Sequence, residues 1–102
     1  MSKLIPQTML EAIPNLYDTE NVKDPICHIK LFTPDSNWTW HIIEMSKDDK
    51  DTCFGYVIGH ESELGYFNLS EIEKVRGGLG LAVELDTNYK ATHLSEVKRG
   101  AK

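Results

Sequence analysis

The sequence predicts an α+β fold: a four-stranded antiparallel meander sheet with short helices packed mainly on one face. Four runs rich in β-branched and aromatic residues follow one another, at 26–33, 38–46, 52–60 and 64–69. The connections between them have hairpin length, so consecutive strands should be antiparallel neighbours. The chain has 102 residues, 40% of them apolar, and shows no repeat or linker, which predicts a single domain over residues 1–102.

A short helix is predicted before the first strand. Thr8 and Glu11 have the spacing of a capping box, and Leu10 and Ile13 follow helical periodicity. Pro14 should end this helix. The polar, turn-rich residues that follow, 15–25, predict a loop or one helical turn.

A second helix is predicted directly after the fourth strand. Ser70 and Glu73 again have capping-box spacing, and the helix should span 71–76 and end at the glycines 77–78.

The C-terminal part is predicted to complete the fold. Residues 79–85 could add a short strand to the sheet, and 92–98 should form one or two helical turns with Leu94 and Val97 facing inward.

The hairpin loops predict a register, because each loop determines which residues lie opposite each other. Pairing Thr33 with Trp38, Met45 with Thr52 and His60 with Leu64 gives one apolar face for the helices to cover. Its members are Ile29, Leu31, Trp38, Trp40, Ile42, Val57, Phe67 and Leu69. On this face Gly55 and Gly59 would leave room for the neighbouring Trp rings.

The opposite face should mix aromatic, polar and histidine side chains. Its members are His28, Lys30, Phe32, Thr39, His41, Ile43, Phe54, Tyr56, Ile58, His60, Tyr66 and Asn68. Residues 79–97 could pack over half of it, or part of it could stay open as a binding surface.

Composition and spacing favour no catalytic or metal chemistry. His28, His41 and His60 could share a face, but no metal-ligand spacing accompanies them, so we expect no metal and no cofactor. The glycine-rich residues 77–80 follow a helix, whereas a phosphate-binding loop precedes one. The sequence therefore predicts a protein that is not an enzyme.

The compartment follows from the cysteines and from the lack of membrane signals. No apolar run is long enough to span a membrane, and Pro6 and Glu11 interrupt any signal-peptide core. We expect a cytoplasmic protein in which Cys27 and Cys53 are buried, reduced thiols.

Several motifs together resemble a known family. They are Leu4-Ile5-Pro6, the run from Phe32 to Trp40, the run from Phe54 to Phe67, and Leu69 to Glu73. The chain is similar over nearly its whole length to a family of short uncharacterised bacterial proteins, a domain of unknown function. Its members are carried by plasmids, integrative elements and phages, among antirestriction, mobilisation and replication genes. The resemblance implies a small accessory protein of mobile DNA and supplies no catalytic residues.

We therefore expect non-catalytic binding of a protein partner, such as a host defence or DNA-processing enzyme. A net charge of -5 suits a protein that occupies a basic nucleic-acid channel. The expected contact residues are Asp35, Asn37, His41, Tyr56, Glu61, Glu63 and Tyr66. Asp35 and Asn37 could instead serve only to form their turn.

Two alternatives remain open at this stage. Tyr56, Tyr66 and Phe54 on one sheet face are typical of base-stacking platforms, although the basic residues are scattered. Self-association through an open face would give a homodimer.

Overall fold

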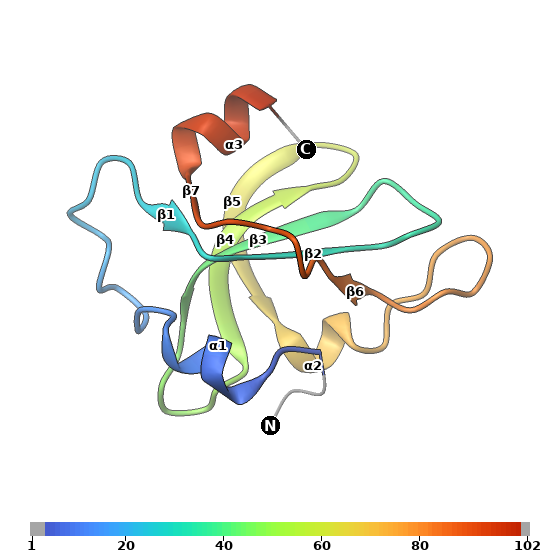
Figure 1. Cartoon of the computed structure of the whole chain (residues 1–102), viewed down its shortest axis with the longest axis horizontal. Helices are drawn as coiled ribbons and strands as arrows, with labels where there is room; N and C mark the ends of the chain where they lie inside the picture. The colour runs from blue at the N-terminus through green and yellow to red at the C-terminus, as the bar shows by residue number, and fades with distance from the viewer. Residues whose placement is uncertain (1–3, 101–102) are drawn as a thin grey trace.

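The computed structural model describes residues 4–100, which form an antiparallel sheet with short helices on both of its faces (Figure 1). Five strands make the main sheet in the order β5-β4-β3-β2-β6, and two make a small separate ladder, β1-β7. The strands are β1 (Ile26–Cys27), β2 (Ile29–Phe32), β3 (Thr39–Met45), β4 (Thr52–Ile58), β5 (Ser62–Asn68), β6 (Glu84–Leu85) and β7 (Thr92–His93). The helices are α1 (Gln7–Glu11), α2 (Leu69–Ile72) and α3 (Leu94–Gly100).

The predicted antiparallel meander is present, but the main sheet has five strands and not four. The fifth is the short strand expected within 79–85, because β6 pairs with β2 at the sheet edge. The first predicted strand is divided at His28 into β1 and β2, and β1 pairs with β7 near the C-terminus.

The predicted register holds in the centre of the sheet and fails at two places. Leu31 lies opposite Trp40, and Trp40 lies opposite Val57, as expected. Between Ile42 and Glu44 the pairing of β3 with β4 shifts at a β-bulge. Phe67 lies opposite Cys53, not opposite Val57, because the turn between β4 and β5 comes earlier than predicted.

The main core lies on the predicted apolar face. It contains Ile5, Leu10, Ile13, Ile29, Leu31, Trp40, Ile42, Met45, Cys53, Leu69, Ile72 and Val83. Both α1 and α2 contribute buried residues to it, and α1 and α2 lie together at the same side of the sheet in Figure 1. The exposed Trp38 is not part of this core.

A second, smaller core lies on the opposite face, where α3 packs. Leu94 and Val97 of α3 meet Cys27 and Ile43, with Phe54 and Tyr56 packed beside them. Among the described residues, α1 and α2 therefore pack on the main-core face, as expected for the helices, and α3 packs on the opposite face. Leu94 and Val97 are buried as predicted, but the helix spans Leu94–Gly100, and Thr92–His93, predicted as helical, form β7.

The helices begin without the predicted capping boxes. Helix α1 follows Pro6, and no side chain caps it. The Asp51 carboxylate, in the β3–β4 turn, accepts hydrogen bonds from the Ser70 amide (2.7 Å) and hydroxyl (2.9 Å) at the start of α2. Asp24 does the same for Ser95 of α3, at 2.8 and 2.7 Å. Each cap therefore comes from a distant part of the chain.

Candidate functional site

An open groove of about 360 Å³ lies on the main-core face, at the end of the sheet where the β2–β3 and β4–β5 turns meet. Its floor is aromatic and aliphatic, with the Trp38 and Trp40 rings stacked at a centroid distance of 6.0 Å. The residues that line it are Trp38, Trp40, Val57, His60, Glu61, Glu63, Gly65, Tyr66 and Phe67. Trp38 is 36% exposed, so a large aromatic surface is available to a ligand.

The position of Trp38 is fixed by its backbone and by its ring contacts. The Thr33 hydroxyl accepts a hydrogen bond from the Trp38 amide (3.2 Å), and the Trp38 carbonyl accepts one from the Thr33 amide (3.0 Å). A Cβ at Gly59 would lie 2.5 Å from the Trp38 ring, so only glycine allows this close approach, as predicted. Gly55 instead leaves room for the backbone carbonyl of His41.

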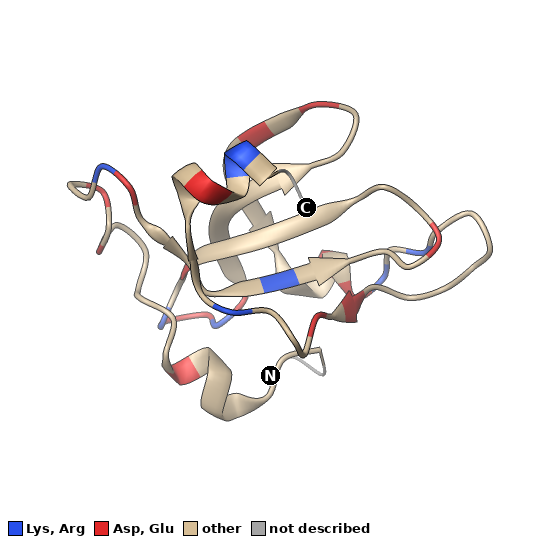
Figure 2. Cartoon of the chain, turned by 45° about the horizontal axis from the view of Figure 1, so that its top comes forward, with Lys and Arg blue, Asp and Glu red and all other residues tan. Residues whose placement is uncertain are grey.

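The rim of this groove is acidic. Glu63 of β5 lies in the same cross-strand row as Val57 and Trp40, and Glu61 precedes it in the turn. Figure 2 shows acidic positions and no basic ones at the tip of the β4–β5 hairpin. The residues that line the groove, all within the described chain, include no Lys or Arg. We call this site the Trp38 groove.

A second groove, of about 440 Å³, lies on the opposite face of the same hairpin. Phe54 and Tyr66 lie opposite each other on β4 and β5, with ring centroids 5.0 Å apart. Tyr66 is 57% exposed. Its pKa is raised, mainly by desolvation and also by a hydrogen bond with Tyr17. The rim has mixed charge, because Lys23, Lys98 and Glu20 also line this groove.

Glu44 anchors the wall of this second groove and was missed by the sequence analysis. It is 3% exposed, yet it accepts hydrogen bonds from the Tyr17 amide (2.9 Å), the Thr19 amide (2.8 Å) and the Thr19 hydroxyl. The bulge in β3 brings Glu44 to this face, since Ile42 and Met45 on either side belong to the main core. A strict alternation gives no sign of the bulge.

Among the predicted contact residues, those of the β4–β5 hairpin lie together. Glu61, Glu63 and Tyr66 are exposed on β5 and its turn. Tyr56 is only partly buried, with Lys98 Nζ 5.8 Å from its ring centroid. The β2–β3 turn is at the same end, as expected: the rings of Trp38 and His60 contact each other edge to face, with centroids 5.8 Å apart.

Two other predicted contact residues have partners within the molecule. His41 is completely buried and its Nδ1 lies 3.3 Å from the Tyr89 hydroxyl, because the C-terminal segment covers this half of the face. Asp35 accepts hydrogen bonds from the amides of Leu79 (2.6 Å) and Leu81 (3.3 Å). Its carboxylate thus holds a neighbouring loop. Asn37 is exposed in the turn.

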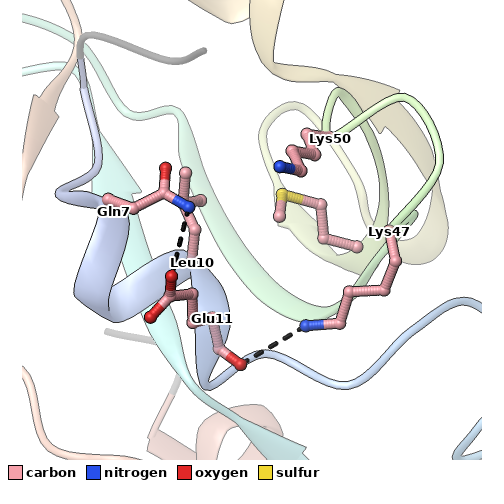
Figure 3. Close-up of a pocket in the computed structure, with 6 residues that line it drawn as sticks. Gln7, Leu10, Glu11, Lys47 and Lys50 are labelled. Atoms are coloured by element: carbon pink, nitrogen blue, oxygen red, sulfur yellow. Dashed lines mark hydrogen bonds between the residues drawn. The ribbon is translucent and has the colours of Figure 1, made fainter.

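A small hollow of about 130 Å³ lies between α1 and the β3–β4 turn (Figure 3). The Lys47 ammonium donates to the backbone carbonyl of Glu11 (3.3 Å), and the Gln7 amide donates to the Glu11 carboxylate (3.4 Å). The Lys47 bond ties the helix to the turn, and the Gln7 bond lies within α1.

The cysteines are buried, and the described residues hold no cluster of metal ligands. Cys27 and Cys53 are free and buried, and desolvation raises the pKa of each to about 12. No group of three or more His, Cys, Asp or Glu side chains in residues 4–100 is arranged to hold a metal ion. Within the same residues, no helix is both long and apolar enough to cross a bilayer.

Comparison with known protein families identifies a match over nearly the whole chain. A family described as proteins of unknown function, DUF2958, matches residues 4–102. No curated protein and no solved structure matches the chain.

Proposed function

The chain belongs to this DUF2958 family, whose function is unknown, and we propose that it is a small non-catalytic accessory protein that binds a protein partner through the Trp38 groove. The observation that carries this proposal is a preformed aromatic floor beside two exposed carboxylates. Exposed Trp and Tyr side chains supply rigid apolar area at protein interfaces. Since Trp38 is fixed by Thr33 and Gly59, little side-chain entropy would be lost on binding.

The acidic rim supports a partner with a basic surface. Glu61 and Glu63 would pair with Lys or Arg, and the Trp38 ring attracts a cation placed over its face. Enzymes that hold nucleic acid have such basic surfaces. The resemblance of the 32–40 and 54–67 runs to proteins of plasmids, integrative elements and phages supports a host defence or DNA-processing enzyme as the partner. Such a protein would act in the cytoplasm.

A pulldown with a charge-reversed control tests the proposal. The tagged chain is exposed to a bacterial lysate, in parallel with Glu61→Lys/Glu63→Lys and with Asp48→Lys/Glu96→Lys. Asp48 and Glu96 are exposed and lie outside the groove. Because each double variant replaces two acidic residues by lysine, the two variants have the same net charge. We expect a partner that is retained by the wild type and the control and lost by the hairpin variant. Loss from both variants, or no reproducible partner, would contradict the proposal.

Single-stranded nucleic acid is the alternative ligand, and the second groove favours it. Tyr66, Tyr17 and Phe54 offer surfaces for base stacking, and Lys23 and Lys98 lie at the rim. Glu20 and Glu44 oppose it in the same groove. Under this alternative, single strands bind at low salt and Tyr66→Ala weakens binding. A flat titration with labelled oligonucleotides would remove it.

A further inference from the structure

We propose that the partner adds an extended segment to the free edge of β5, with Lys or Arg at alternate positions facing the Trp38 groove. This inference rests on the proposed function and names the mode of binding and the chemistry of the ligand. Strand addition combines backbone hydrogen bonds, which supply affinity, with pockets for alternate side chains, which supply specificity.

β5 has the features of an available edge. It is the outermost strand of the five, it has seven residues, and it pairs with β4 without a bulge. Native edges are commonly blocked by Pro, Lys or a bulge, and β5 contains none of these. Leu64 and Tyr66 are 42% and 57% exposed.

The hydrogen-bonding phase of the β4–β5 ladder shows which amides are available. The Gly59 amide donates to the Glu61 carbonyl, and the Leu69 amide donates to the Asp51 carbonyl, at the two ends of this ladder. In an antiparallel ladder, hydrogen-bonded pairs alternate with non-hydrogen-bonded pairs. Because Glu61 and Leu69 bond to β4 or its ends, the other odd-numbered residues of β5 bond to β4 as well. Leu64 and Tyr66 therefore direct their N–H and C=O groups away from β4, toward an incoming strand.

The two faces of this edge differ in chemistry. Residues of an added strand that lie opposite Glu63 and Gly65 would face the Trp38 groove. Among residues 4–100, no heavy atom beyond Gly65 and its chain neighbours lies within 4 Å of a Cβ at Gly65, so a long side chain could cross it toward the Trp rings. Residues opposite Leu64 and Tyr66 would meet the exposed apolar surface of the other face.

Charge selects among the occupants of this edge. An incoming Arg or Lys opposite Glu63 would pair with a carboxylate and lie near an aromatic face. A second copy of the chain would bring another net charge of -5 and its own Glu61 and Glu63 to the same edge. The edge therefore suits a basic, extended protein segment better than self-association.

Blocked peptides of alternating Arg and Val, as long as β5, test the inference by fluorescence anisotropy with the full chain. In the proposed pairing the Val amides bond to β5 and the Arg amides point to solvent. N-methylation of the Val amides should weaken binding at least about tenfold, because it removes several backbone hydrogen bonds. N-methylation of the Arg amides should change it by less than about twofold. A Glu–Val peptide should not bind.

Amide hydrogen exchange locates the contact. Peptide should slow exchange at Leu64 and Tyr66, and Glu61→Lys/Glu63→Lys should abolish binding while Asp48→Lys/Glu96→Lys preserves it. Equal loss with both methylated peptides, or unchanged exchange at Leu64 and Tyr66, would overturn strand addition, whereas the pulldown result on the Trp38 groove would stand. Protection of the same two amides by raising the concentration of the chain alone would show that a second copy is the occupant, and would also overturn it.

Discussion

Replacing the buried Glu44 by Gln should destabilise the protein and release the loop that lines the second groove. One carboxylate oxygen accepts from the Tyr17 amide and the other accepts from the Thr19 amide and hydroxyl. A Gln side chain has one oxygen, so at least one amide loses its acceptor and faces an N–H group. The amide oxygen should stay with Thr19, where it keeps two bonds, and Tyr17 should be released.

The expected loss is about 2 kcal/mol of unfolding free energy. A hydrogen bond to a charged group contributes about 1.5–3 kcal/mol. A neutral amide costs less to bury than a carboxylate, which offsets part of this loss. Urea denaturation measures the loss, and limited proteolysis within 15–22 reports the loop. Glu84→Gln, at an exposed position of β6, is the matched control. A stability within about 0.5 kcal/mol of wild type, with the loop still protected, would refute the role assigned to Glu44.

Three further predictions concern the carboxylates and thiols that hold the fold. Asp51→Ala should lower the unfolding free energy by about 1 kcal/mol, since Ser70 loses its cap; urea denaturation measures it, and no change would contradict the capping role. Hydrogen bonds, chiefly from Thr52, lower the pKa of Asp49 to about 2, so its stabilisation should be complete above about pH 4 and disappear as pH falls through 2. Acid unfolding should show that Asp49→Asn loses less stability than the wild type over that pH range. Cys27 and Cys53 should react with a thiol reagent only on unfolding, and rapid labelling of the native protein would contradict their burial.

The sheet could be predicted because the alternation of apolar residues is a property of each short run of sequence and needs no knowledge of distant contacts. Trp40, Val57 and Leu31 lie where the hairpin lengths placed them. The turn between β4 and β5 was placed too late, yet Phe67 stays on the predicted face, because the error moved the register by an even number of residues.

The candidate site was predicted only in part, because several of its determinants are not local. Glu61, Glu63 and Tyr66 were found from their place in the hairpin. Glu44 was not, because one bulged residue re-aims it and the alternation shows no bulge. The burial of His41 depends on Tyr89, which is distant in sequence.

The helix starts were misassigned for a similar reason. Leu-Ser-Glu occurs at 69–71 and again at 94–96, and in each case the serine bonds to an aspartate from another part of the chain. This repeated tripeptide was the available signal. It identifies a helix start, but the identity of the partner aspartate depends on the tertiary fold.

These contacts divide the carboxylates of the protein into two groups with different consequences. Asp24, Asp35, Glu44 and Asp51 are used inside the molecule, where each accepts backbone amides from a distant segment. Reversing their charge would disrupt the fold before it tested any electrostatic contact. The net charge of -5 alone therefore does not show where on the protein a partner binds. The electrostatic argument for a basic partner depends on Glu61 and Glu63, because their carboxylates line an open aromatic groove beside a free strand edge.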